Sequence, residues 1–152
     1  MPHHRQIKTT MSTIPRGIRN NNPLNIRFTR PHLWLGQTEG TDKEFCTFRS
    51  MEWGLRAGLY LLSKYHSQYG LHTVKAIITR WAPPSDGNDT ASYIREVTNN
   101  MGGIGNLPRM MNSLYKLARG MCRVESRYVL DEENFCKAFG LLPEKMQKYW
   151  QG

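Results

Sequence analysis

The stretch from residue 50 to residue 70, SMEWGLRAGLYLLSKYHSQYG, contains the clearest structural pattern of the chain. Apolar residues recur in it at the spacing of one face of an α-helix: Met51, Leu55, Leu59 and Leu62. Ser50 is suited to be the N-cap, and Gly70 is suited to stop the helix. We therefore predict that this stretch forms the central helix of the fold.

Further helical patterns follow on the C-terminal side. A helix that starts at Thr73 must end near Trp81, because Pro83 and Pro84 cannot continue it. Three more helices are predicted from caps and apolar spacing: one after Asn88-Asp89-Thr90 with Tyr93, Ile94 and Val97 on one side, one capped by Asp131 and closed by Gly140, and one from Pro143 with Met146 and Trp150. Another helix opens at Asn106 and Pro108, and its predicted buried stripe is Leu107, Met111, Leu114, Ala118 and Met121.

Residues 16–48 have a different composition. They contain three consecutive asparagines, several prolines and glycines, and two β-favouring pieces, 25–28 and 45–48, which predict a short strand or hairpin within ordered loops. Residues 1–15 lack periodicity, so we predict a flexible leader followed by one domain over residues 16–152. A chain of 152 residues is close to the commonest size of a single domain. The predicted fold class is mainly α (α+β), a single domain with a small β-hairpin.

Charge is the strongest signal in the composition. The chain has 21 Lys and Arg against 12 Asp and Glu, a net charge of +9, which attracts polyanions such as nucleic acid, anionic lipid or an anionic cell wall. A general contribution to solubility is the alternative explanation. The basic residues are scattered, without the dense block of a nucleic-acid arm, so we expect no specific nucleic-acid partner. No apolar run approaches the length of a membrane span, and none is predicted.

The cysteine and histidine patterns predict neither a disulfide framework nor a metal site. Cys46, Cys122 and Cys136 are odd in number and lack a CxxC spacing, so we expect reduced and mostly buried thiols. The five histidines show no HExxH spacing, and no cofactor is implied. The basic N-terminus has no apolar segment of a signal peptide. The protein is therefore expected to be made in the cytoplasm and delivered by a virion, a holin or a secretion apparatus.

Glu125 is the first candidate for chemistry. Four residues after Met121, it continues the apolar face of its helix and lies at the C-terminal end, where burial and the helix dipole both disfavour a carboxylate anion. These are the conditions for a general acid that works near neutral pH. The alternative is an ordinary surface pair with Arg123 or Arg127.

The segment from Asn20 to Arg27, NNNPLNIR, is the second candidate. The paired donors and acceptors of amide side chains suit the hydroxyl and acetamido groups of an amino sugar. The alternative is a turn built from asparagine hydrogen bonds. Trp34, Trp81 and Tyr93 are candidates for faces on which sugar rings stack, although single aromatics are more often core residues.

The order of these motifs resembles a family of small phage-encoded proteins, described as virion structural proteins or as lysozyme-like proteins that degrade peptidoglycan. The resemblance covers residues 17–140, and its motifs are GIRNNNPLNIR from Gly17, Trp34-x-Gly36, Phe45-x-x-Phe48, Gly54-Leu55-Arg56-Ala57 and RWAPP from Arg80 followed by NDTxxYI from Asn88. The family implies a lysozyme-like domain and a bacterial target.

A more distant resemblance is to the glucosaminidases of autolysins and flagellar muramidases. In those enzymes a catalytic Glu stands on a helix before the asparagine block, whereas residues 1–20 of this chain contain no acidic residue. The segment Met121-Cys122-Arg123-Val124-Glu125-Ser126 is similar to the end of a lysozyme-type catalytic helix. We therefore predict a circular permutation, which brings Glu125 to the asparagine block in space.

These resemblances imply cleavage of the glycan strand of peptidoglycan, by a lysozyme, a glucosaminidase or a lytic transglycosylase. Glu125 would be the general acid, and the substrate-binding residues would be Asn21, Asn22, Asn25, Arg27, Trp34, Trp81 and Tyr93. A second carboxylate, needed for hydrolysis, could come from Glu39, Asp42 or Glu44. The expected partners are peptidoglycan and virion or secretion-machine components, with action at the cell wall or in the periplasm. The alternative is a non-catalytic virion structural or cell-wall-binding module.

Overall fold

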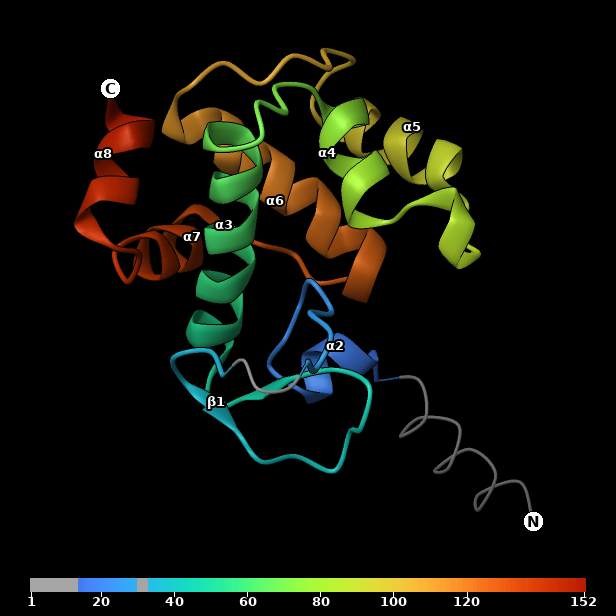
Figure 1. Cartoon of the computed structure of the whole chain (residues 1–152), viewed down its shortest axis with the longest axis vertical. Helices are drawn as coiled ribbons and strands as arrows, with labels where there is room; N and C mark the ends of the chain where they lie inside the picture. Colours follow the sequence, from blue (N-terminus) through green and yellow to red (C-terminus); the bar gives the residue numbers. More distant parts are fainter. Residues whose placement is uncertain (1–13, 30–32) are drawn as a thin grey trace.

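The chain is wound around one long helix, α3 (Met51–Ser67), in a computed structural model that describes residues 14–29 and 33–152 (Figure 1). Most of the leader predicted over residues 1–15 lies outside the described residues. The predicted apolar face of α3 is in the core, where Leu55, Leu59 and Leu62 are fully buried. Gly70 adopts a positive φ of 63° and turns the chain just beyond the helix, so the stop signal lies in the turn and α3 ends at Ser67.

Five further helices surround α3: α4 (Val74–Trp81), α5 (Thr90–Asn100), α6 (Met111–Ser126), α7 (Glu132–Phe139) and α8 (Glu144–Gln151). In Figure 1, α4 and α5 lie on one side of α3, and α7 and α8 lie on the other. Three of the predicted N-caps accept a backbone hydrogen bond in the first turn of their helix: Thr73, Asp89 and Asp131. We call helices α3 to α8 the helical body.

Helix α6 starts later than the sequence predicted. It begins at Met111 and not at Asn106, because the preceding residues pair with another segment: the Leu107 amide donates to the His72 carbonyl at 2.9 Å, and Asn106 forms a bridge with Thr73. The predicted stripe is nevertheless buried, with Leu114, Ala118 and Met121 fully inside and Leu107 buried ahead of the helix.

The hairpin is smaller than predicted. Strands β1 (Gln37–Thr38) and β2 (Thr47–Phe48) pair antiparallel, with Gln37 opposite Phe48. The piece 45–48 thus contains a strand, whereas 25–28 contributes a single bridge from Arg27 to Phe45. With the short helix α2 (Arg16–Arg19), these segments form what we call the loop region, residues 16–48. The fold class, mainly α with a small hairpin, is confirmed.

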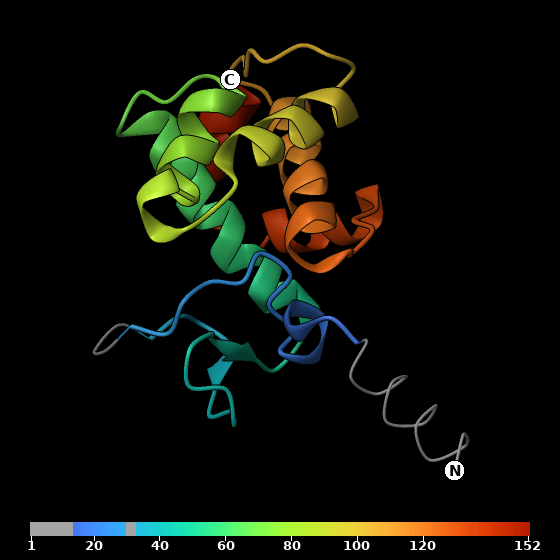
Figure 2. The same cartoon turned by 90° about the vertical axis from the view of Figure 1, so that its right-hand side faces the viewer.

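Glycines let the loop region approach the helical body at van der Waals distance (Figure 2). A Cβ on Gly54 would overlap the backbone oxygen of Asn21, and a Cβ on Gly58 would overlap the side chain of Leu24. The C-terminal turn of α6 is fastened to the same loop, because the Ser126 hydroxyl donates to the Pro23 carbonyl at 2.9 Å. These contacts hold the asparagine segment against the end of α6.

None of the described helices is both long enough and apolar enough to cross a membrane. Cys46 and Cys122 are buried free thiols, and Cys136 is exposed.

Candidate active site

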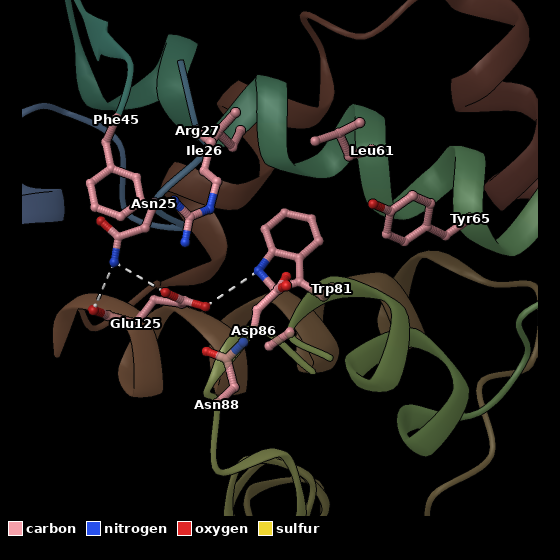
Figure 3. A pocket seen from close by; sticks show the side chains of 11 residues that line it. Asn25, Ile26, Arg27, Phe45, Leu61, Tyr65, Trp81, Asp86, Asn88 and Glu125 are labelled. Atoms are coloured by element: carbon pink, nitrogen blue, oxygen red, sulfur yellow. Dashed lines mark hydrogen bonds between the residues drawn. The ribbon is translucent and has the colours of Figure 1, made fainter. Parts of the chain in front are cut away.

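A cleft lies where the loop region meets α3, α4 and α6 (Figure 3). Residues from four separate segments line it: Asn25, Ile26, Arg27, Phe45, Leu61, Tyr65, Trp81, Ala82, Asp86, Asn88 and Glu125. Four residues of the sequence-based site, Asn25, Arg27, Trp81 and Glu125, therefore share one cavity.

The carboxylate of Glu125 is the polar centre of this cleft. It lies in the last turn of α6, partly buried, and receives hydrogen bonds from three side chains of other elements. Asn25 donates through Nδ2 to Oε1 at 3.1 Å, Trp81 donates through Nε1 to Oε2 at 3.3 Å, and Tyr93 donates through its hydroxyl to Oε2 at 2.9 Å. These contacts replace the surface pair with Arg123 or Arg127 that was the alternative for Glu125.

The environment of Glu125 favours its protonated form. Burial raises the pKa of this carboxyl above its ordinary value, although hydrogen bonds from Asn25, Tyr93 and Trp81 and the charge of Arg27 act in the opposite direction. The pKa of Tyr93 is raised well above its ordinary value, mainly by burial, so its hydroxyl stays protonated and remains a donor. Because Oε2 accepts two hydrogen bonds and Oε1 accepts one from a side chain, Oε1 has room for a transferable proton.

Local backbone geometry turns the Asn25 side chain towards Glu125. Asn25 has a φ of 52°, in the left-handed region that asparagine tolerates better than most residues. Its Nδ2 also donates to the backbone carbonyl of Glu125 at 3.1 Å, which fixes the amide at the end of α6. The two residues are 100 positions apart in the sequence.

The other two asparagines have structural roles, which corrects their assignment to sugar binding. Asn22 is fully buried, and its amide donates to the carbonyls of Ile26 and Cys46 and accepts from the Ile26 amide. Asn21 has a φ of 51° and donates to the Phe48 carbonyl at 2.9 Å. The alternative that the sequence allowed, a turn built from asparagine hydrogen bonds, describes these two residues.

The three aromatic candidates lie in different surroundings. Trp81 lines the cleft and packs edge to face on Tyr65, with ring centroids 6.1 Å apart. Tyr93 is buried and holds the Glu125 carboxylate, so it is a positioning residue and not a sugar-stacking face. Trp34 packs against Tyr60 at 5.6 Å and is not among the described residues that line the cleft.

The acidic residues proposed as partners of Glu125 do not line the cleft within the described part of the chain. Asp42 accepts hydrogen bonds from Arg16 and Asn20, and Glu44 pairs with Arg16 and Arg27 at 2.8 and 3.2 Å. Glu39 lies exposed in the same loop. The second carboxylate that does line the cleft is Asp86.

Sequence reasoning missed seven lining residues: Ile26, Phe45, Leu61, Tyr65, Ala82, Asp86 and Asn88. Leu61 and Tyr65 are one helical turn apart on α3, a spacing that places two side chains on one face but does not show which surface that face lines. Within residues 14–29 and 33–152, no three His, Cys, Asp or Glu side chains are grouped as a metal site requires.

The fold and the cleft thus define a small helical protein with a carboxylic acid held by three donors in an open site. No protein-family model matches the chain. The chain is 41% identical over 97 residues to Protein P5 of Pseudoalteromonas phage PM2. The aligned part covers 62% of this chain and 60% of Protein P5. The chain is therefore similar to a protein of a bacteriophage.

Proposed function

We propose that the protein is a phage-type cell-wall lytic protein that cleaves the glycan strands of peptidoglycan, with Glu125 as the general acid. The observation that supports this most directly is the partly buried Glu125 carboxyl, whose raised pKa keeps a proton available in a cleft. The protein would act at the cell wall or in the periplasm, delivered by virion or secretion-machine components. The net charge of +9 suits an anionic cell wall.

In the proposed reaction Glu125 transfers its proton from Oε1 to the glycosidic oxygen. The bond between that oxygen and the anomeric carbon then breaks, and positive charge develops on the sugar ring. Trp81 offers the edge and face of an indole beside Glu125, and Arg27 offers a guanidinium at the same wall, so both can contact the sugar chain. Tyr93 and Asn25 hold the carboxyl in place during the transfer.

The proposal includes a lysozyme-like domain produced by circular permutation. A permuted site requires the acid from the late helix to meet the asparagine segment, and the hydrogen bond between Asn25 and Glu125 supports this. A small hairpin on one side of the cleft and helices on the other also suit such a domain.

The direct test is Glu125→Gln. Glutamine keeps the size of the side chain but has no acidic proton, so we expect clearance of a purified peptidoglycan suspension to slow by about 10²–10⁴-fold. Glu96→Gln is the matched control, because Glu96 is exposed on α5 and is not among the described lining residues. Circular dichroism should show the same helix content in all three proteins.

The pH dependence of stability gives a second readout of the same variant. The folded-state pKa of Glu125 is raised, so the favourable state persists below the ordinary carboxyl pKa, and stability is lost as the pH rises through the folded pKa. Glu125→Gln removes this loss, and the variant should be at least as stable as the wild type at neutral pH. Full lytic activity in Glu125→Gln would contradict the proposed role.

A non-catalytic cell-wall-binding or virion module is the second candidate, favoured by the basic charge and the similarity to a phage protein. A wild-type protein that sediments with peptidoglycan but releases no soluble fragments would establish this alternative and overturn the enzymatic proposal.

A further inference from the structure

We infer that Asp86 is a second catalytic carboxylate, which activates a water molecule for attack on the sugar after Glu125 protonates the leaving oxygen. This inference rests on the proposed glycan cleavage and adds to it the nucleophile and the reaction type. It assigns hydrolysis, where a single carboxylic acid would leave a lytic transglycosylase equally open.

Asp86 and Glu125 line the same cleft from different elements. Glu125 belongs to the last turn of α6, whereas Asp86 ends the 3-10 turn η1 (Pro84–Asp86) that follows α4. Figure 3 shows both side chains at the cleft, with Asn88 next to Asp86 and Trp81 between α4 and the carboxylate of Glu125. A sugar in the cleft can therefore meet one carboxyl group from each element.

The loop that presents Asp86 is firmly closed. Pro83 and Pro84 fix two consecutive φ angles, and Gly87 turns the chain back with a φ of 81°. Asn88 donates to the Pro83 carbonyl at 3.1 Å across the loop. The Thr90 hydroxyl donates to the Ala82 carbonyl at 2.6 Å, which joins the start of α5 to the end of α4. The backbone of Asp86 is thus held without help from its own side chain.

The Asp86 carboxylate has no structural role within the described residues. It is exposed, and it forms no hydrogen bond or ion pair with any of them. Other loop carboxylates do stabilise the fold: Asp42 bonds to Arg16, and Asp89 and Asp131 cap helices. A carboxylate that lines a cleft on a rigid loop, and bonds to nothing there, is available to a ligand or to a water.

The proposed step balances with water as the only co-reactant. Glu125 gives its proton to the glycosidic oxygen, and the bond from that oxygen to the anomeric carbon breaks with both electrons going to the oxygen. A water oxygen bonds to the anomeric carbon, and its proton passes to Asp86. Solvent then removes the proton from Asp86 and restores the one on Glu125. The product has a new reducing end with inverted configuration, as expected when a carboxylate activates water on the opposite face of the ring.

The test compares Asp86→Asn with the wild type on purified glycan strands. Loss of the base should lower the rate of hydrolysis by about 10²–10⁴-fold. Glu96→Gln removes the same unit of charge from an exposed site on α5 and should cleave at the wild-type rate. Equal melting temperatures for Asp86→Asn and the wild type would show that the loop still folds.

Chemical rescue separates a base from a structural residue. In Asp86→Ala, sodium azide should restore part of the cleavage and give a glycosyl azide, because the small anion is a nucleophile that needs no deprotonation. Mass spectrometry of wild-type products should show hydrated reducing ends and not cyclic anhydro ends.

The outcomes distinguish this inference from the proposed function. Cleavage by the wild type, loss of cleavage in Glu125→Gln and full activity in Asp86→Asn would overturn the role of Asp86 alone. Anhydro ends in the wild-type products would also overturn it and would establish a transglycosylase. Cleavage by Glu125→Gln, or no cleavage by the wild type, would overturn the proposed function together with this inference.

Discussion

The two sides of the cleft are stabilised by different interactions. The helical body is held by a continuous apolar core, whose fully buried members include Leu55, Leu59, Leu62, Val74, Ile77, Ile78, Val97, Leu114 and Met121. Such a core gains stability from burying apolar area and depends mainly on the total volume that fills it. The catalytic candidate Glu125 is attached to this side by its helix.

The loop region is held by directed polar contacts and by close backbone approaches. The buried amide of Asn22 joins two segments, and Arg16 joins α2 to the acidic loop through Asp42 and Glu44. A second, smaller apolar cluster lies here around Phe48. Polar side chains on this side of the cleft are therefore as often structural as available to a ligand, which is why Asn25 and Asn22 differ in role although both belong to one motif.

The contact between the two sides should be the most sensitive point, and Gly54→Ala tests it. The added methyl group would overlap the Asn21 backbone, which cannot move aside as a flexible side chain would. We expect the free energy of unfolding to fall by about 3 kcal/mol, although alanine favours a helix over glycine by about 1 kcal/mol. Chemical denaturation measures this, and hydrogen exchange should show the largest loss of protection within residues 20–48.

Gly105→Ala is the control for that change. Its added Cβ would meet no atom within 4 Å, so stability should stay the same. A Gly54→Ala protein as stable as the wild type would mean that the loop region tolerates displacement, and the contrast between the two sides would fail.

The helical body could be largely predicted from the sequence because its signals are local. Caps such as Thr73 and Asp131 act within one turn, and the spacing that placed Leu114 and Met121 inward also placed Glu125 on the face that meets the core. The start of α6 was wrong because a pairing with residues 72 and 73 competes with the helix, and local patterns do not contain that information.

The site was only partly predictable because most of its contacts are distant in sequence. The hydrogen bond from Asn25 to Glu125 was anticipated through the resemblance, not through any local pattern. Asn22 could not be told from Asn25 by residue type, since burial decides which amide faces the cleft. Asp86 gave no signal, because an acidic residue in an exposed Pro-rich loop is common.

Acid should weaken the loop region before the helical body. The guanidinium of Arg16 holds the pKa of Asp42 well below its ordinary value, so the stability from this carboxylate is present above the ordinary pKa and is lost as the pH falls towards the folded one. Asp42→Asn should lower the melting temperature at neutral pH by a few degrees and remove part of the loss seen in acid. Calorimetric scans of both proteins across acidic pH measure the effect.

A matched control for Asp42 is Glu133→Gln. Glu133 pairs with Lys137 within α7, and both side chains are largely exposed, so this pair should contribute little. Equal acid sensitivity in Asp42→Asn and the wild type would show that the ion pairs of the loop region are not what distinguishes it.

The smallest expected effect is a shift in the pH profile of activity on changing Tyr93 to Phe. The Tyr93 hydroxyl stabilises the Glu125 anion by a hydrogen bond, so its removal should raise the pKa of Glu125 further. A general acid is active while protonated, and the alkaline limb of the profile should therefore move to higher pH. A hydrogen bond to a charged group contributes about 1.5 kcal/mol, and one pKa unit corresponds to about 1.4 kcal/mol, so the expected shift is about one unit.

Tyr115→Phe is the control for the shift, because it removes a tyrosine hydroxyl that donates to the Leu130 carbonyl and does not contact Glu125. Both variants lose one hydroxyl from a partly or fully buried ring, so a general loss of stability would affect them alike, whereas the alkaline limb should move in Tyr93→Phe alone. Trp81 still donates to Oε2 in that variant, which keeps the carboxyl in position and limits the change to its protonation. An alkaline limb that stays in place in Tyr93→Phe, or moves to lower pH, would mean that another group controls the pH dependence. In that case Glu125 would not be the acid that limits the reaction.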